Sequence, residues 1–174
     1  MAHAVRHASL GELPGAPPRL ARALNRLTAP RTAPTSVLRA HRWLYEHSAG
    51  RIGHGMIGAP TLLLRTTGRR TGQLRCSALC YARDGDRFVL AASNDGADGN
   101  PAWFNNLVSD PSVELQVGRR RFSGRAAVLI PEDPDYQRLW RSMNATNHGR
   151  YDWYQSKTSR PIPLVMVTTT TASP

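Results

Sequence analysis

Basic and hydroxyl side chains crowd one short stretch of the chain, Arg65–Arg75, which reads RTTGRRTGQLR. Its glycines allow backbone N–H groups to converge in a tight loop, and arginine and threonine add side-chain donors around it. Four like charges within eleven residues repel one another unless an anion or acid offsets them. The stretch therefore predicts a binding site for a phosphate-type group. The GxxxxGKS/T spacing of a Walker A loop is missing, and an ordinary charged hairpin is the alternative interpretation.

A second stretch could bind a planar ligand. Ala92–Asn106 reads ASNDGADGNPAWFNN, a loop rich in glycine, asparagine and aspartate that leads into a helix with Trp103 and Phe104 in its first turn. Such a loop can approach a flat ligand closely, and Trp103 could close over it. The alternative is a plain connection whose tryptophan packs in the core.

The segment His148–Tyr154, HGRYDWY, brings aromatic hydroxyl groups together. Tyr151 and Tyr154 are three residues apart, so they are predicted to lie on one face of a helical turn, with His148 one turn earlier. Phenol groups beside an apolar pocket can orient a carbonyl or donate a proton. The alternative is a set of aromatic side chains that pack over the mouth of a barrel.

Other kinds of site are not indicated. The chain has no GxSxG nucleophile elbow, no pair of carboxylates that suggests glycosidase chemistry, and no histidine and cysteine cluster at zinc-ligand spacing. Cys76 and Cys80 would lie ~13 Å apart on an extended strand, beyond the reach of a disulfide. We therefore expect no metal and a reducing, cytoplasmic setting.

The chain is strongly basic, with 23 Lys and Arg against 12 Asp and Glu and a net charge of +11, which fits an anionic partner. Arg119–Arg121 and Arg125 could contact nucleic acid, but aromatic residues are not interleaved with them, so we expect no nucleic-acid partner. Arg19–Leu27, RLARALNRL, separates leucines and arginines on two helical faces. This pattern predicts either a helix packed on the body or one that associates with a membrane surface.

The elements that must position these stretches are mainly strands. Hydrophobic runs bounded by turn signals predict about six strands, mostly linked by hairpins. Strands do not alternate with long helices, so an antiparallel barrel with peripheral helices is expected. The predicted strands are Thr61–Thr67, Leu74–Arg83, Arg87–Ser93, Val113–Val117, Arg121–Leu129 and Ile162–Thr170, and the predicted helices are Arg19–Leu27, Ser36–Ala49, Pro101–Val108 and Pro134–Ala145.

Prolines divide the first part of the chain. Residues 1–35 are expected to form a flexible basic extension with one short amphipathic helix, and residues 36–174 to form the barrel domain. The threonine-rich end, Thr168–Pro174, is expected to fray. The longest stretches without a charged residue, Ile52–Leu64 and Pro161–Pro174, fall short of the ~20 apolar residues that a membrane-spanning helix needs.

At these stretches the chain resembles the deazaflavin-dependent nitroreductase family, whose members use coenzyme F420 on a split β-barrel. The resemblance covers roughly Ser36–Thr168 and rests on several motifs in order: TLLLRTTGRRTGQLR, YARDGDRFVLAASNDG, NPAWFNNL, DPSVELQVG and SRPIPLVMV. It implies a mainly β (α+β) fold, an antiparallel split β-barrel of the FMN-binding type with N-terminal and peripheral helices. It also implies an oxidoreductase that transfers a hydride from reduced F420 to an activated double bond, quinone, imine or nitro compound. FMN is the alternative coenzyme, and a monomer or homodimer is expected.

The resemblance also implies roles for individual residues. Tyr154 would stand beside a small hydrophobic electron acceptor as proton donor or carbonyl orienter, with Ser93 as its catalytic partner. The implied substrate-binding residues are Cys80, His148, Tyr151 and Tyr154. The implied coenzyme-binding residues are Arg69, Arg70, Thr71, Arg75, Ser77, Ala78, Ser93, Asn94, Asp95, Gly96, Trp103 and Asn106.

The chain departs from the family pattern in one loop. The family usually shows NGGAP and then a Lys-His or Arg-His pair before PAW, whereas this chain reads NDGADGN before Pro101. Asp95 and Asp98 beside a polyanionic coenzyme are expected to weaken its binding or to reshape the loop for a different substrate. A non-catalytic barrel that binds deazaflavin, flavin or haem, and a basic nucleic-acid-binding module, are the alternative functions.

Overall fold

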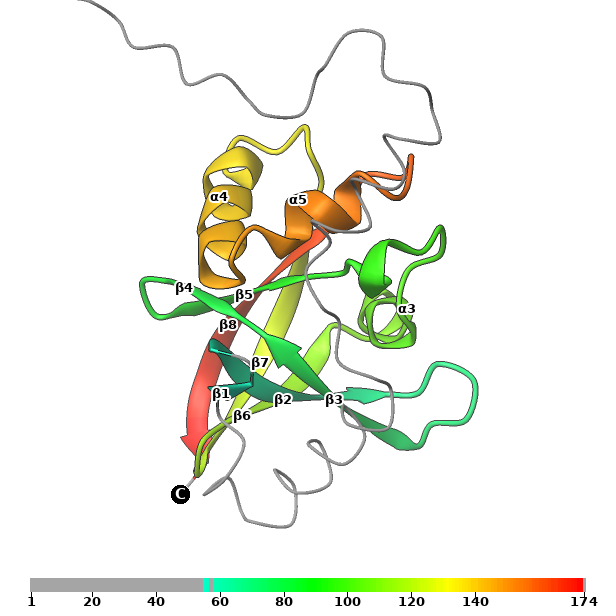
Figure 1. Ribbon diagram of the computed structural model, residues 1–174. Coiled ribbons are helices and arrows are strands. Elements are labelled where there is room, and N and C mark those ends of the chain that lie inside the picture. Colours follow the sequence, from blue (N-terminus) through cyan, green and yellow to red (C-terminus); the bar gives the residue numbers. More distant parts are fainter. Residues whose placement is uncertain (1–54, 57, 174) are drawn as a thin grey trace, which may run out of the picture. The chain divides into compact units, whose positions relative to one another are not determined.

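The computed structural model describes residues 55–56 and 58–173 of the chain (Figure 1). The predicted helices Arg19–Leu27 and Ser36–Ala49 and the predicted boundary after residue 35 lie outside the described residues. Within the described part the protein is mainly β, as predicted, with a few short helices beside one antiparallel sheet.

Eight strands pair in the order β1-β2-β6-β7-β8-β5-β4, and β3 pairs with β2 off this path. All pairings are antiparallel, and the hairpins predicted around Asp84–Asp86 and around Gly118 are confirmed. The strands are β1 (Gly55–Met56), β2 (Ala59–Thr67), β3 (Leu74–Cys80), β4 (Ala82–Asp84), β5 (Arg87–Ala91), β6 (Ser112–Val117), β7 (Arg120–Leu129) and β8 (Leu164–Ser173).

The predicted strand Leu74–Arg83 is divided at Tyr81 into β3 and β4. The Tyr81 N–H donates to the Pro60 carbonyl at 3.1 Å, after which the chain leaves β2 and pairs with β5 instead. No ladder joins β3 to β4 or β5 among the described strands, so their hydrogen-bonded pairings do not close into a ring. The antiparallel sheet is therefore confirmed, whereas its closure into a barrel is not observed.

The threonine-rich end does not fray within the described residues, contrary to our expectation. β8 continues to Ser173 and pairs with β7 as far as the Arg121–Ser173 position. A run of β-branched threonines suits a pleated strand, and the neighbouring strand supplies the backbone partners that the sequence alone does not reveal. The register shifts between Ser123 and Gly124, where a Cβ at position 124 would lie 2.8 Å from the Thr168 carbonyl oxygen.

Strand β5 is buried on both faces and divides the core in two. Phe88 and Leu90 point into one cluster, Val89 and Ala91 into the other, because successive side chains of a strand alternate. The first cluster is covered by α3 (Ala102–Ser109), and the second by α4 (Tyr136–Thr146) and α5 (Arg150–Gln155). In Figure 1 these two groups of helices lie apart, with α4 and α5 together.

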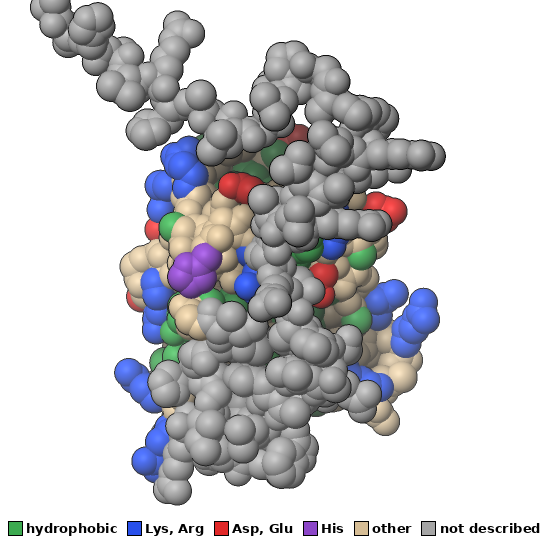
Figure 2. All heavy atoms as spheres, in the orientation of Figure 1, with side chains coloured by type: hydrophobic (Ala, Val, Ile, Leu, Met, Phe, Trp, Pro, Cys, Tyr) green, Lys and Arg blue, Asp and Glu red, His purple; other side chains and the backbone are tan. Residues whose placement is uncertain are grey.

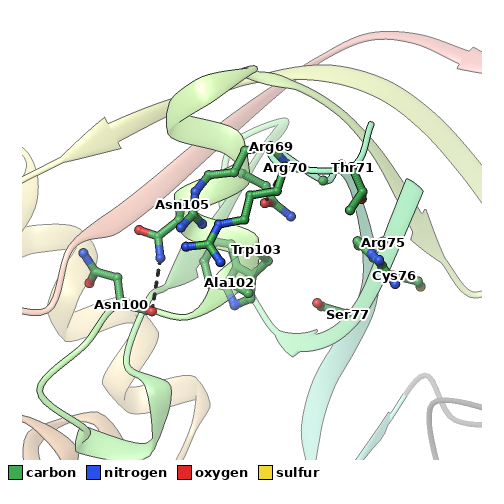
Figure 3. A pocket seen from close by; sticks show the side chains of 12 residues that line it. Arg69, Arg70, Thr71, Arg75, Cys76, Ser77, Asn100, Ala102, Trp103 and Asn105 are labelled. Carbon is green, nitrogen blue, oxygen red and sulfur yellow. Dashed lines mark hydrogen bonds between the residues drawn. The ribbon is translucent and has the colours of Figure 1, made fainter. Parts of the chain in front are cut away.

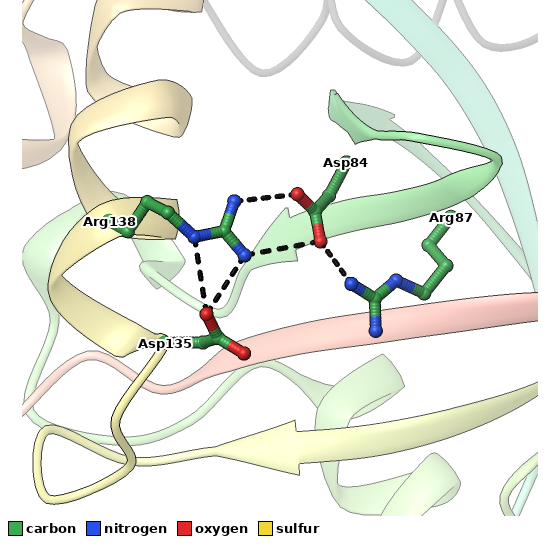
Figure 4. Close-up of polar contacts among 4 residues, drawn as sticks. All are labelled: Asp84, Arg87, Asp135 and Arg138. Atoms are coloured by element: carbon green, nitrogen blue, oxygen red, sulfur yellow. Dashed lines mark hydrogen bonds and ion pairs between the residues drawn. The ribbon is translucent and has the colours of Figure 1, made fainter.

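An ion-pair network fastens α4 to the β4–β5 turn (Figure 4). Arg138 of α4 donates to the Asp84 carboxylate at 2.6 Å and to Asp135 at 2.9 Å, while Arg87 of β5 pairs with the same Asp84 carboxylate. Hydrogen bonds from Arg138, and to a smaller extent from Arg87, lower the pKa of Asp84 below its usual value. The side chain of Asp84 is 14% exposed, so this carboxylate is the best-shielded part of the network.

Replacing Asp84 with Asn is expected to lower Tm at pH 7, because it removes the charge that both arginines share. A carboxylate whose pKa is lowered by folding stabilises the protein above its unfolded-state pKa, and this stability is lost as pH falls through the folded-state value. The difference in Tm between wild type and Asp84→Asn should therefore shrink in acid. Thermal unfolding against pH measures it.

Asp86→Asn is the matched control, since Asp86 lies exposed in the same turn and forms no ion pair among the described residues. Equal losses of Tm in the two variants would contradict a specific role for the Asp84 network.

Candidate active site

A cavity of about 580 Å³ lies between the β2–β3 turn and α3 (Figure 3). We call it the arginine pocket. Three of its arginines come from the stretch that the sequence singled out, and its opposite wall comes from the start of α3. The lining residues are Gly68, Arg69, Arg70, Thr71, Arg75, Cys76, Ser77, Asn100, Ala102, Trp103, Asn105 and Asn106.

The β2–β3 turn is folded tightly on itself. The Gly68 N–H donates to the Gln73 carbonyl at 2.8 Å, and the Gly72 N–H donates to the Gly68 carbonyl at 2.8 Å. A Cβ at Gly68 would lie 2.9 Å from the Gln73 carbonyl oxygen, and Gly72 has a φ of +66° that favours glycine. The glycines of this stretch are therefore required by the shape of the turn.

The buried side chain of Asn106 ties this turn to α3. Its amide nitrogen donates to the Thr66 hydroxyl at 3.1 Å, and its amide oxygen accepts the N–H of Arg69 at 3.2 Å. Asn106 is 6% exposed, so these bonds are shielded from water. The predicted coenzyme residue Asn106 thus fixes the position of Arg69 relative to the helix.

Arg69, Arg70 and Arg75 form no ion pair with any described carboxylate. Arg75 donates to the Gln73 side chain at 3.0 Å, and Figure 3 shows Arg69 and Arg70 extending beside Trp103 and Asn105. A cluster of uncompensated guanidinium groups attracts a ligand with several negative charges.

The pocket also contains a polar atom that lacks a partner. Asn100 Oδ1 is buried and has no hydrogen-bond partner among the described residues, and it lines the arginine pocket. A buried acceptor without a partner is costly. The arginines and the Thr71 hydroxyl of the pocket form a donor set that fits a coenzyme with a phosphate and carboxylates.

The structure brings together just over half of the predicted coenzyme residues. Arg69, Arg70, Thr71, Arg75, Ser77, Trp103 and Asn106 all line the pocket. Predicted residues outside its lining are Ala78, Ser93, Asn94, Asp95 and Gly96. Ala78 alternates with Ser77 along β3, so its side chain points to the opposite face of the strand.

Five pocket residues were not among the predicted coenzyme residues, although all of them except Cys76 lie within the two stretches that the sequence singled out. They are Gly68, Cys76, Asn100, Ala102 and Asn105. Cys76 could have been found, because it flanks Arg75 in the predicted loop and strand. The packing of α3 against β2 that brings Asn100 and Asn105 into the pocket carries no local sequence signal.

A second group of predicted residues surrounds α5. Tyr151 and Tyr154 are each 5% exposed, and their ring centroids lie 6.1 Å apart. Burial raises the pKa of both phenols, and it raises the pKa of the Cys80 thiol on β3. We call these three residues the tyrosine cluster, because Cys80 lies close enough to contribute to the raised pKa of both phenols. The structure therefore brings together three of the four predicted substrate-binding residues.

His148 does not lie in a helical turn that precedes the tyrosines, contrary to our expectation. It precedes α5 with a φ of +54°, followed by Gly149 with a φ of +74°, so the helix begins only at Arg150. Its side chain is exposed, whereas those of Tyr151 and Tyr154 are buried. The three-residue spacing correctly predicted that both tyrosines lie in one helix, but that helix does not include His148.

The loop after β5 lies against the segment that follows α5. The Arg160 guanidinium donates to the carbonyls of Ala92, Ser93 and Ala97 at 2.9–3.0 Å. Ser93 is thereby held in the same neighbourhood as α5, which contacts the short 3-10 helix η1 (Asn94–Gly96). The predicted catalytic residue Ser93 directly precedes η1, so this contact places it near the helix that carries Tyr151 and Tyr154.

Neither Asp95 nor Asp98 lines the arginine pocket. The Lys157 ammonium donates to the backbone carbonyl of Asp95 at 2.7 Å, and the Thr158 hydroxyl donates to the Asp98 carboxylate at 3.1 Å. Both residues therefore lie beside the segment that follows α5, whereas the sequence alone had suggested that they lie beside the coenzyme.

Strand β3 contributes one cysteine to the arginine pocket and one to the tyrosine cluster. Cys76 lines the arginine pocket and Cys80 belongs to the tyrosine cluster, four residues further along the same strand, a separation of ~13 Å. Neither cysteine forms a disulfide within the described residues. In the part of the chain that the structure describes, no group of His, Cys, Asp and Glu could hold a metal, and no helix is long and apolar enough to cross a membrane.

Comparison with known proteins shows the family to which the chain belongs. The family model described as F420H(2)-dependent quinone reductase matches residues 37–169. An F420H(2)-dependent quinone reductase of Mycobacterium tuberculosis is 50% identical over 133 residues, which cover 76% of this chain and 89% of that protein. A relative from Mycobacterium bovis matches to the same extent.

Solved structures give the same picture. An F420-H2 dependent reductase (FDR-A) superposes with a TM-score of 0.57 and 28% identity, over 63% of this chain and 94% of that one. A structure described as a domain-swapped dimer gives a TM-score of 0.59 and 26% identity, over 78% of this chain and 100% of that one. The predicted dependence on F420 is confirmed: the chain belongs to the F420H(2)-dependent quinone reductase family and is an F420-dependent oxidoreductase.

Proposed function

We propose that the protein binds reduced F420 in the arginine pocket and reduces a quinone held beside the tyrosine cluster. The observation that carries the proposal is the set of three arginines, Arg69, Arg70 and Arg75, that line one cavity without a described carboxylate partner. They would hold the coenzyme's phosphate and acidic tail. The quinone is suggested by the family and by the names of its mycobacterial members.

The remaining residues of the pocket would hold the deazaflavin part of the coenzyme. Ser77 and Trp103 line the cavity, and the backbone near Ala78 and the loop Ser93–Gly96 would complete the contacts that the family resemblance implies. When bound, reduced F420 supplies a hydride. The chain's own groups would bind and orient the partners and exclude water from the reacting faces.

The tyrosine cluster would orient the acceptor. Its buried aromatic rings suit a planar, apolar quinone, and the hydroxyl of Tyr154 would bind the carbonyl. Ser93 and His148 are the further contacts that the family resemblance implies. Burial keeps Tyr154 protonated at neutral pH, because it raises the pKa of the phenol. The phenol is thus able to donate a hydrogen bond, and the proton that completes the reduction would come from Tyr154 or from water.

Three finer features belong to the same proposal. We propose that the open antiparallel sheet is a split β-barrel, and the TM-score of 0.57 to an F420-H2 dependent reductase supports this. A homodimer is supported by the domain-swapped dimer among similar structures. Association of Arg19–Leu27 with an anionic membrane surface, where hydrophobic quinones reside, is proposed from the sequence alone.

Arg70→Ala is expected to raise the Kd for F420 at least tenfold, a loss of ~1.4 kcal/mol, because one of the three charges in the pocket is removed. Fluorescence titration of the coenzyme measures the change. Arg119→Ala removes the same charge from a residue outside the pocket and should leave the Kd within twofold. An unchanged Kd in Arg70→Ala would exclude Arg70 from the site.

Tyr154→Phe is expected to lower kcat with menadione by about tenfold, the effect of one lost hydrogen bond at the reacting group, while the Kd for F420 stays the same. Tyr136→Phe is the control, since its hydroxyl bonds the Ile162 carbonyl at 2.6 Å and no pocket arginine. Equal kcat in wild type and Tyr154→Phe would remove Tyr154 from the mechanism.

A purified protein that neither binds F420 nor oxidises its reduced form with menadione would refute the proposed function.

A further inference from the structure

Side chains of the segment that follows α5 hold the loop that follows β5. The Lys157 ammonium donates to the Asp95 carbonyl at 2.7 Å, and the Thr158 hydroxyl donates to the Asp98 carboxylate at 3.1 Å. The Arg160 guanidinium donates to three backbone carbonyls of the same loop. The shape of this loop therefore depends on a neighbouring segment as well as on the loop's own turns.

Arg160 holds the backbone on both sides of Ser93. Its Nη2 donates to the Ala92 carbonyl at 3.0 Å and to the Ser93 carbonyl at 2.9 Å. These carbonyls belong to the peptide groups before and after the Cα of Ser93. Each peptide group is planar, so a nitrogen that binds both restricts the φ and ψ angles of Ser93 and the direction of its Cα–Cβ bond. Arg160 Nε donates to the Ala97 carbonyl at 3.0 Å, which anchors the guanidinium group.

The hydroxyl of Ser93 is not used by the fold. Ser93 is 9% exposed and precedes η1 without a side-chain capping bond. Its hydroxyl makes no hydrogen bond with any residue that the structure describes. A serine hydroxyl offers one proton to donate and two lone pairs that accept. The fold thus fixes the backbone of Ser93 and leaves its side-chain donor unoccupied.

The loop that carries Ser93 is held against the helix that carries Tyr154. A Cβ at Gly96 would lie 2.7 Å from the Tyr154 carbonyl oxygen, so the backbones of η1 and α5 approach each other closely. Arg160 follows α5 in the chain and bonds the residues that precede and follow η1. One arginine therefore sets both the conformation of Ser93 and the place of its loop beside α5.

The guanidinium group of Arg160 is committed to this loop. Its side-chain hydrogen bonds within the described part of the chain all go to carbonyls of the loop, and it forms no ion pair there. Its nitrogens lie in one plane at fixed angles, so Nη2 and Nε bind carbonyls from both ends of η1 at once. The flexible point charge of a lysine lacks this geometry.

We propose that Arg160 is a positioning residue for the reaction. By holding the peptide groups on both sides of Ser93, it directs the Ser93 hydroxyl toward the reactants, and small errors in such a position lower the rate strongly. Arg160 acts through Ser93 and touches neither coenzyme nor acceptor. This inference rests on the function proposed above, in which Ser93 is a contact that the family resemblance implies.

A double-mutant cycle tests the proposal, because a residue that acts through another has no effect once the second is removed. At saturating reduced F420, we expect Arg160→Gln to lower kcat with menadione about tenfold, since the hydroxyl of Ser93 is misplaced. Ser93→Ala should lower kcat by about the same factor. The double variant should lie within about twofold of Ser93→Ala, because no hydroxyl remains to be positioned.

Arg138→Gln is the matched control, since it removes a guanidinium group that also joins two elements but belongs to the Asp84 network. It should lower Tm and leave kcat within about twofold of wild type. Arg160→Lys keeps the charge without the planar fork, and it takes the place of Arg160→Gln in the cycle if the glutamine variant does not fold. An unchanged kcat in the Arg160 variant, or losses that multiply in the double variant, would overturn the proposal.

A measurement without turnover separates this inference from the proposed function. The ¹⁵N order parameter of the Ser93 amide in the free protein should be about 0.85 in wild type and in Arg138→Gln, and it should fall toward about 0.6 in the Arg160 variant. A Ser93 amide that is flexible in wild type, or that stays rigid without Arg160, would overturn the proposal even if the protein reduces quinones. The expected loss of rigidity in a protein that fails to reduce quinones would support the hold of Arg160 on Ser93 and refute the proposed acceptor alone.

Discussion

Strand β5 buries both of its faces, and the rest of the molecule is arranged to cover it. Phe88 and Leu90 require one cover and Val89 and Ala91 another, so helices must lie on both sides of the sheet. α3 provides one cover and α4 with α5 the other. The arginine pocket is built at the start of the first cover, and the tyrosines are part of the second. The positions of the two halves of the proposed site therefore follow from the burial of both faces of β5.

Arginine serves two different purposes in this chain. Arg65, Arg138 and Arg160 are occupied by carboxylates, amides or carbonyls and hold elements together. The arginines of the pocket have no such acid partner, and Figure 2 shows the described Lys and Arg side chains at separate places along the margins of the face in view. The net charge of +11 therefore does not describe one surface. What matters for the coenzyme is which guanidinium groups the fold leaves without a carboxylate.

Local features of the structure could be predicted from the sequence, while partners distant in the chain could not. Glycine-containing turns, alternating strands and the start of α3 at Pro101 follow from backbone preferences, and they were predicted correctly. The division of a strand at Tyr81 and the pairing of the threonine-rich end depend on strands far away. The same reason explains Asp95, whose sequence neighbours suggested the coenzyme site, whereas it does not line the arginine pocket and its short helix η1 contacts α5. Tertiary contacts thus decided where this charge lies.

Lys157 is the one lysine in the sequence, and its exposed ammonium donates to the Asp95 carbonyl and lies 4.4 Å from the centre of the Trp153 ring. Apart from the terminal amine, an amine-directed acylating reagent therefore has a single target, the Lys157 side chain. Acylation would neutralise this ammonium, which bridges the loop after β5 and the end of α5. A fluorophore attached there would sit on an aromatic face beside the proposed acceptor site. This chain thus contains a natural position for a reporter of that loop, with no residue to be added or removed.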